Sequence, residues 1–92
     1  MSGKEVMDLV YSNNIEGLKE YLNERKNVNL EYEDEDDYTP VIYASYDGYT
    51  ECLQLLLLHN ANVYTRSNNG FTGLMFAAMD NHIECFLLMS NQ

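Results

Sequence analysis

The sequence predicts an all-α protein, a solenoid of about three helix-turn-helix repeats joined by extended loops. The first observation is an internal repeat: residues 39–53 match residues 72–86 at a constant offset of 33, with Thr, Ala, Asp, Glu and Cys recurring at equal positions. A fixed period of this length indicates a repeat architecture. The second is that apolar residues recur at the spacing of one helix face, as at Val6, Leu9 and Val10. Stacked repeats bury such faces in one continuous core.

The first helix pair is expected within residues 5–29. Apolar residues at helical spacing within residues 6–10, and again within residues 15–22, predict two short helices. Residues 12–14 are Ser or Asn, which favour turns and caps, so we place a tight turn between the two helices. Charged and amide side chains cover the outer side of this segment. We therefore expect it to act as a polar N-terminal cap of the stack.

An acidic loop follows at residues 31–37, where six of the seven residues are Asp or Glu. Self-repulsion opposes a helix or strand in this run, so we predict a solvated and mobile loop. Thr39 ends it as a good N-cap, and Pro40 suits the first position of a helix, where its missing N–H is not needed. A helix is expected from Pro40 to about Asp47, and Gly48 ends it.

The remaining helices are predicted from the same kinds of signal. Thr50 is expected to cap a helix that carries leucines on one face and runs to about residue 58. Residues 64–71 form an extended polar segment that ends in an Asn-Gly tight-turn signal. Thr72 is then expected to cap a third short helix, and the last helix covers about residues 82–89.

The composition limits the class of protein and the class of partner. The 92 residues allow one unit, a single array that we divide into approximate repeats 5–33, 34–66 and 67–92. The formal net charge is −10, from fifteen Asp and Glu against five Lys and Arg. Such a charge repels nucleic acid and anionic lipid, so neither nucleic acid nor a membrane is expected as a partner. A basic protein or peptide is favoured instead.

Two further patterns favour an intracellular protein. No apolar run is long enough to span a bilayer, and the N-terminus lacks the apolar segment of a signal peptide. We therefore expect a cytoplasmic location, with the nucleus as the alternative. Cys52 and Cys85 occupy the same position in successive repeats, and helices packed about 8–10 Å apart hold such positions beyond the reach of a disulfide. Both thiols are predicted to be unpaired and buried.

These motifs resemble those of the ankyrin repeat family. Residues 39–44 and 72–77 are similar to the family's Thr-Pro-Leu-His-x-Ala signature. Residues 48–51 resemble its Gly-His-x-Glu element, and residues 59–63 resemble its Gly-Ala-Asp-Val-Asn turn. The resemblance covers nearly the whole chain, with two extra residues in the acidic loop shifting the first repeat to an offset of 35. It implies two antiparallel helices and a β-turn finger in each repeat.

The sequence departs from the family pattern in two ways. The signature His is replaced by Ile42 and Met75, so the hydrogen bond that links adjacent loops in the family is expected to be absent. The signature Pro is replaced by Gly73 in the third repeat, which should loosen the first turn of that helix.

The resemblance implies a protein-binding site on the concave surface, where the fingers and the first helices meet. Tyr38 and Phe71 take equivalent finger positions, and Tyr46 and Met79 take equivalent exposed positions near the ends of first helices. Large residues at such positions are typical interface anchors. The alternative is that these side chains, in a chain with eight tyrosines, only pack on their neighbours. The candidate protein-binding residues are Glu35, Asp36, Tyr38, Tyr46, Asp47, Asn68, Asn69, Phe71, Met79 and Asp80.

No catalytic, cofactor or metal site is predicted. The sequence contains no Gly-rich phosphate loop, no His-Glu-x-x-His and no Cys-x-x-Cys. His82, Cys85 and Cys52 would need a fourth ligand to bind zinc, and His82 matches a position where the family has a structural His. The acidic loop lacks the central Gly and the distal Glu of an EF-hand, so a solvated tip is preferred over a calcium site.

We therefore expect a non-catalytic module that binds a protein or peptide, with a basic one favoured, on a preformed concave surface. The alternative is a structural or regulatory segment of a longer ankyrin-repeat protein. Leu87, Leu88 and Met89 crowd the final helix without a polar cap after them. This end is expected to tolerate exposure, to continue into further repeats or to self-associate.

Overall fold

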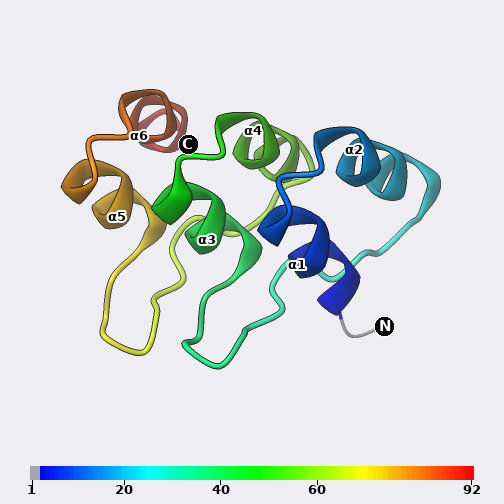
Figure 1. The fold of residues 1–92 in the computed structure, drawn as a ribbon, viewed down its shortest axis with the longest axis horizontal. Coiled ribbons are helices and arrows are strands. Elements are labelled where there is room, and N and C mark those ends of the chain that lie inside the picture. Colours follow the sequence, from blue (N-terminus) through cyan, green and yellow to red (C-terminus); the bar gives the residue numbers. More distant parts are fainter. Residues whose placement is uncertain (1–2) are drawn as a thin grey trace.

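The computed structural model describes residues 3–92 as six helices in three consecutive pairs (Figure 1). The helices are α1 (Lys4–Tyr11), α2 (Ile15–Glu24), α3 (Pro40–Asp47), α4 (Thr50–Leu58), α5 (Gly73–Met79) and α6 (Ile83–Ser90). Helices α1, α3 and α5 form an inner row, and α2, α4 and α6 form an outer row beside it (Figure 1). Residues 3–92 contain no strand. The predicted all-α solenoid of three helix pairs is confirmed.

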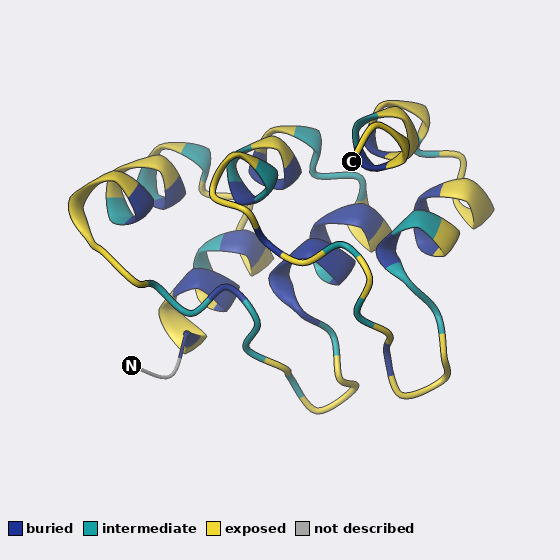
Figure 2. Ribbon diagram, turned by 180° about the vertical axis from the view of Figure 1, so that it is seen from behind, coloured by how far each residue is buried: buried dark blue, intermediate teal, exposed yellow. Residues whose placement is uncertain are grey.

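The core lies between the two rows and between successive pairs. Each helix packs on its partner and on the equivalent helix of the next pair. Ala44 and Ala77, both fully buried, are small enough to let α3 and α5 pack closely, while larger side chains such as Leu53 and Leu56 fill the space towards the outer row. Figure 2 shows buried positions on the facing sides of the two rows and exposed positions at the loop tips.

Side-chain caps explain where three of the helices begin. The Asn14 side chain accepts a hydrogen bond from the Gly17 N–H at 2.9 Å. The hydroxyls of Thr39 and Thr72 accept from backbone N–H groups three residues later, both at 3.3 Å, which confirms the two predicted Thr caps. The prediction that Thr50 caps α4 is wrong. Thr50 is the first helical residue, and Tyr49 takes the N-cap position without a side-chain hydrogen bond.

Two loops project side by side from the inner row (Figure 1). We call residues 30–39 finger 1 and residues 63–72 finger 2. Their turns match at an offset of 33 residues: the Asp34 N–H donates to Tyr38 O at 3.1 Å, as the Ser67 N–H donates to the equivalent carbonyl of finger 2 at 2.9 Å. The acidic loop therefore contains no inserted residues relative to finger 2. The prediction that two extra residues lie there is wrong.

The extra residues of the first repeat lie in its second helix and the exit from that helix. Left-handed backbone conformations mark the equivalent turns, with φ of 51° at Asn13 and 76° at Gly48, which are 35 residues apart. The turns after the outer helices have φ of 57° at Asn27 and 66° at Asn60, which are only 33 apart. The offset therefore changes between residues 13 and 27. Asn and Gly serve these turns because they tolerate positive φ.

Gly73 lies in a closely packed place at the start of α5. The residue is buried, and a Cβ atom built on it would lie 2.9 Å from Ser45 Oγ and 2.9 Å from the terminal carbon of Met89. The helix retains its Thr72 cap, so its start remains defined. The replacement of Pro by Gly at this position thus lets α5 and α6 pack against α3.

Candidate functional site

The tip of finger 1 is closed by one carboxylate. Asp34 Oδ1 accepts hydrogen bonds from the backbone N–H groups of Asp36 and Tyr38, both at 2.9 Å. Asp34 Oδ2 accepts a hydrogen bond from the Tyr11 hydroxyl at 2.6 Å, which connects the finger to α1. The sequence predicts a mobile loop here because its charges repel one another. The structure instead has a turn in which one of those charges satisfies backbone donors.

The two fingers are joined to each other through the backbone. The Asn68 N–H donates to Asp36 O at 3.1 Å, and the Thr39 and Thr65 hydroxyl oxygens lie 3.4 Å apart. The departure from the family signature predicts that adjacent loops lack their usual hydrogen bond. Another pair of groups makes the link between these fingers, so their spacing is still fixed.

Four aromatic rings form a cluster where the fingers meet the inner row. We call Tyr38, Tyr46, Phe71 and Phe76 the aromatic cluster. The ring of Phe76 is at its centre, with its centroid 5.4 Å from that of Tyr38, 5.3 Å from Tyr46 and 5.4 Å from Phe71. Edge-to-face pairs at this spacing are favourable, each contributing about 0.5–1.5 kcal/mol beyond burial. The cluster thus connects both fingers with α3 and α5.

The rings continue along the inner row towards the N-terminal end. The centroid of Tyr43 is 6.2 Å from that of Tyr46 and 4.8 Å from that of Tyr11. Tyr11 precedes Tyr46 by 35 residues and Met79 follows it by 33, so the three occupy the same place on α1, α3 and α5. All three are partly or largely exposed, Met79 most of all at 61%. The inner row therefore presents a large side chain from every pair.

Three carboxylates lie close enough to Tyr38 of the aromatic cluster to affect its pKa. The pKa of Tyr38 is raised by burial first, and then by the neighbouring Tyr46 and the charges of Asp36, Asp34 and Asp80. These charges come from finger 1 and from the residue at the end of α5. A cation that approached the cluster would therefore meet both acidic groups and ring faces.

Asp47, a predicted contact residue, lies close to two tyrosines at the end of α3. Its carboxylate is the main cause of the raised pKa of the Tyr49 phenol. The pKa of Tyr43 is raised by burial first and then by the Asp47 carboxylate. Because this carboxylate already interacts with two phenols, we keep it outside the proposed contact surface.

The structure brings some of the predicted site residues together and leaves others apart. Tyr38, Tyr46 and Phe71 meet through Phe76, with Met79 and Asp80 exposed at the end of α5. Glu35 lies apart and lines a hollow of about 170 Å³ between finger 1 and α1. Asn68 and Asn69 are exposed at the tip of finger 2, where Asn69 also accepts a hydrogen bond from the Ser67 hydroxyl.

Phe76, Tyr43 and Tyr11 belong to this row of rings, although the sequence reasoning does not select them. Phe76 is only 5% exposed, so it supports the cluster from beneath rather than offering contact area. Tyr11 could have been found by applying the offset of 35 residues that relates Asn13 to Gly48. No local signal indicates that Phe76 lies at the centre, because its neighbours come from both fingers and from α3.

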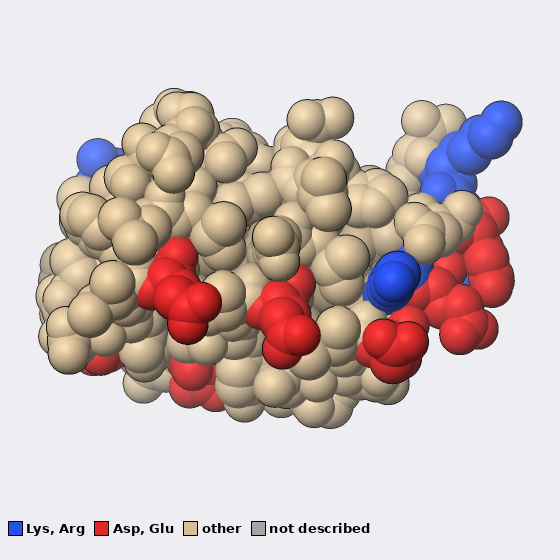
Figure 3. Space-filling view, turned by 90° about the horizontal axis from the view of Figure 1, so that it is seen from above, with Lys and Arg blue, Asp and Glu red and all other residues tan. Residues whose placement is uncertain are grey.

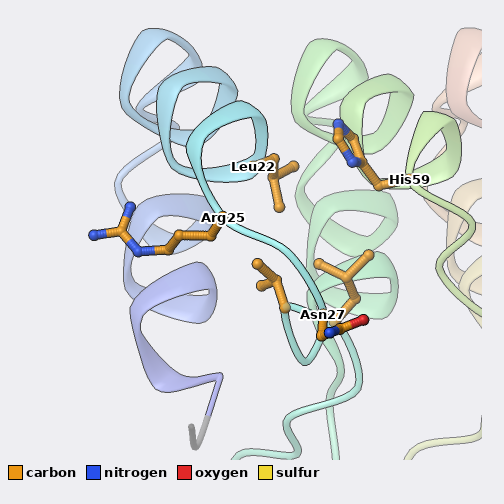
Figure 4. A pocket seen from close by; sticks show the side chains of 6 residues that line it. Leu22, Arg25, Asn27 and His59 are labelled. Carbon is orange, nitrogen blue, oxygen red and sulfur yellow. The ribbon is translucent and has the colours of Figure 1, made fainter.

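A separate hollow of about 160 Å³ lies on the other side of the stack between α2 and α4 (Figure 4). It is lined by Leu22, Arg25, Asn27, Val28, Leu30 and His59. The Arg25 guanidinium points away from the hollow (Figure 4) and lies over the ring of Tyr21, 4.1 Å from its centroid. The lining therefore offers aliphatic groups, the Asn27 amide and the His59 imidazole.

His82 makes structural contacts. Its Nδ1 lies 3.0 Å from Ser45 O, and its ring covers Gly48. The thiol of Cys85 lies 3.6 Å from the Thr50 hydroxyl, while Cys52 contacts the Asn13 side chain at 3.4 Å. Across residues 3–92, no three His, Cys, Asp or Glu side chains converge closely enough to hold a metal ion.

Comparisons with known proteins agree with this architecture. A family model described as ankyrin repeats, in three copies, matches residues 6–92. A comparison with curated proteins found no match. Of the helices in residues 3–92, none has the length and apolar character needed to cross a membrane.

Proposed function

This chain belongs to the ankyrin repeat family, and on that premise we propose that it binds a protein or peptide along the aromatic cluster. Ankyrin repeats are generally protein–protein interaction modules and are typically non-catalytic. One observation carries the choice of surface. Rings from both fingers and from two inner helices form a single continuous cluster, with carboxylates on either side of it.

The proposed contact surface is the exposed part of this cluster with its neighbours: Tyr38, Tyr46, Phe71, Met79, Asp36 and Asp80. Tyr46 and Met79 provide apolar area that a partner would bury, which is the usual source of interface hot spots. The rings already pack against Phe76, so binding need not order them, and the entropy cost of association is reduced. Asn68 and Asn69 would add polar contacts at the rim of finger 2.

The charge of the chain favours a partner with Lys and Arg side chains. A net charge of −10 attracts basic segments over long distance and speeds their association. Close to the surface, Asp36 and Asp80 flank Tyr38, so a guanidinium could pair with a carboxylate while lying over a ring face. We propose a basic peptide segment that also carries apolar or aromatic anchors.

Selection from a displayed library of random 12-residue peptides tests this function. We expect enrichment of peptides that combine Lys or Arg with aromatic or large apolar residues. The selected peptides should lose affinity for a variant with Tyr46→Ala and Met79→Ala, mainly through faster dissociation. The matched control carries Leu58→Ala and Tyr64→Ala, and it should bind as the wild type does. These substitutions remove exposed side chains of α4 and of the start of finger 2, both outside the proposed contact surface.

A second pair of variants tests the electrostatic part. Glu35→Gln with Asp36→Asn should slow association and flatten its dependence on salt, while the control Glu20→Gln with Glu24→Gln removes two charges from α2 and should have less effect. Asp34 is left unchanged because its carboxylate closes the turn. Peptides that bind the Tyr46→Ala, Met79→Ala variant with unchanged affinity would place the binding surface elsewhere.

A further inference from the structure

At three positions of the repeat, burial depends on whether another helix pair follows. The side chains at these positions are fully buried in the first and second pairs, because the next pair covers them. In the third pair the equivalent side chains are exposed. The three sets, in chain order, are Met7, Ile42 and Met75; Val10, Ser45 and Ala78; and Leu18, Leu53 and Phe86.

We call the exposed surface of the third pair the C-terminal face: Met75, Ala78, Asn81, Ile83 and Phe86. It contains a hollow of about 240 Å³ lined by Ala77, Ala78, Asn81, Ile83 and Phe86. Figure 2 shows much of α5 and α6 exposed. Ile83, at 60% exposed, is as apolar as any residue in the core. A contiguous apolar surface of this kind indicates an interaction site.

The same place on the second pair is filled by side chains of the third. Gly48, equivalent to Asn81, lies under the imidazole of His82, which reaches Ser45 O at 3.0 Å. Ser45, equivalent to Ala78, contacts Met89 Sδ at 3.0 Å through its hydroxyl. The C-terminal face thus has the shape of the surface on which, in the second pair, the third pair stacks.

Charge is distributed very unevenly between the two ends of the stack. Residues 67–92 contain two acidic residues, Asp80 and Glu84, and no Lys or Arg, whereas residues 1–37 contain eleven acidic residues against four basic ones. In the view of Figure 3, charged side chains crowd together at the end of the molecule that holds α2, while towards the opposite end they are scattered among uncharged ones. The C-terminal face is therefore where a second molecule of net charge −10 meets the least repulsion.

A second copy cannot dock on this face as a fourth pair would. In such a head-to-tail stack, α1 of the second copy would pack on α5 of the first copy, as α5 packs on α3 within one chain. The residue of α1 that is equivalent to Pro40 of α3 and Gly73 of α5 is Glu5. Pro40 and Gly73 are buried, whereas Glu5 is exposed and carries a charge. Burying that charge without a cation would oppose the contact.

We infer that the C-terminal face binds the same face of a second copy of this chain, in a two-fold symmetric dimer. This arrangement covers both apolar faces at once and places the two acidic N-terminal ends at the far ends of the assembly. Each contact is made twice, as in any isologous interface. The surface contributed by two short helices is small, so the dimer is a weak one that forms and dissociates readily.

Sedimentation equilibrium of the 92-residue chain, from about 10 µM to about 1 mM, tests this inference. We expect the average mass to rise from the monomer value of 10.7 kDa towards twice that value and no further. Ile83→Lys should raise the dissociation constant at least tenfold, with an unchanged helical circular dichroism spectrum because Ile83 is exposed. Leu58→Lys is the matched control, since Leu58 is 71% exposed on α4, and it should dimerise as the wild type does.

Three outcomes would overturn the dimer. A mass that stays at 10.7 kDa up to about 1 mM would mean that another occupant covers the face. A mass that grows beyond two copies would indicate head-to-tail stacking. Equal dimerisation of the Ile83→Lys variant would place the contact elsewhere. The variant with Tyr46→Ala and Met79→Ala should bind the selected peptides more weakly yet sediment as the wild type does, so that the two proposals fail or succeed separately.

Discussion

The Tyr11 hydroxyl donates a hydrogen bond to the Asp34 carboxylate at 2.6 Å, so that a residue at the end of α1 anchors the turn of finger 1. The pKa of Tyr11 is raised by burial first and then by this hydrogen bond and the charge of Asp34. The other oxygen of the same carboxylate accepts two backbone N–H groups. One side chain therefore both closes the finger and ties it to the helix stack.

We predict that Asp34→Ala lowers the free energy of unfolding by about 1–2 kcal/mol, as the loss of a capping side chain does. Tyr11→Phe removes only one partly exposed hydrogen bond and should cost about 0.5–1 kcal/mol. Urea denaturation measures both, and amide exchange at Asp36 and Tyr38 reports the opening of the turn. Asp36→Ala is the control, because its side chain is exposed. Equal effects of Asp34→Ala and Asp36→Ala would show that the turn does not depend on this carboxylate.

Gly48 and Gly70 form a natural matched pair for a second prediction. Both have positive φ, 76° and 84°, so alanine should strain either backbone by about 1–2 kcal/mol. Only Gly48 has a neighbour in the way, since a Cβ there would lie 2.9 Å from the His82 ring, whereas nothing lies within 4 Å at Gly70. Gly48→Ala should therefore lower the thermal midpoint more than Gly70→Ala. The excess should shrink when His82→Ala is combined with Gly48→Ala, and additive effects of these two substitutions would contradict the clash.

Helix starts and the packing order of the pairs could be predicted because their signals are local and recur. The Thr39 and Thr72 hydroxyls each accept a hydrogen bond from the backbone N–H three residues later, so a short stretch of sequence is enough to predict the cap. The 33-residue period then states which helices are equivalent, and equivalent helices of a stack must be neighbours.

The geometry of finger 1 could not be predicted from charge alone. Asp34 and Ser67 are 33 residues apart and each accepts from a backbone N–H four residues later, at 2.9 Å and 3.3 Å. A carboxylate and a hydroxyl can accept the same backbone hydrogen bond in a turn. Only the carboxylate is charged, and the charge of the acidic run is what predicts a mobile loop for finger 1. The sequence also predicts that the two extra residues of the first repeat lie in the acidic run. The positive φ values at Asn13 and Asn27 instead place them around α2.

The aromatic cluster was only partly predictable. The 33-residue period selects Tyr38, Tyr46 and Phe71, because large side chains recur at equivalent positions of successive repeats. The contacts of these three rings with Phe76 depend on how each finger packs over the next helix, and no local sequence signal specifies that packing. Asp47 shows the converse case, since the period selects it as a contact residue without indicating that its carboxylate lies close to Tyr43 and Tyr49.

A third prediction concerns the core. Leu56 is fully buried, whereas Leu58 on the same helix is 71% exposed. Leu56→Ala should lower the free energy of unfolding by about 2–5 kcal/mol, a large share of the total for a domain of this size. Leu58→Ala should change it by less than about 0.5 kcal/mol. Thermal melts followed by circular dichroism measure both, and an unchanged midpoint for Leu56→Ala would place that side chain outside the core.

The last prediction concerns the two thiols and alkaline pH. Burial raises the pKa of Cys52 from 9.0 to about 11 and also raises that of Cys85. The folded chain therefore holds these protons more tightly than the unfolded chain does, so their stabilising contribution is complete below about pH 9 and is lost as pH rises towards 11. The raised pKa values of Tyr11, Tyr38, Tyr43 and Tyr49 act in the same direction.

We expect the urea midpoint to fall steadily between pH 9 and pH 11 and to fall less steeply in a Cys52→Ala variant. At pH 8 the folded protein should react slowly with a thiol reagent, because buried thiols are mostly protonated there and shielded from it. Unfolding in urea without a reductant should then release two reactive thiols. Zero reactive thiols in the monomer would mean that Cys52 and Cys85 are joined. That result would contradict the stack itself, in which Cys52 faces the Asn13 side chain on one side and Cys85 faces the Thr50 hydroxyl on the other.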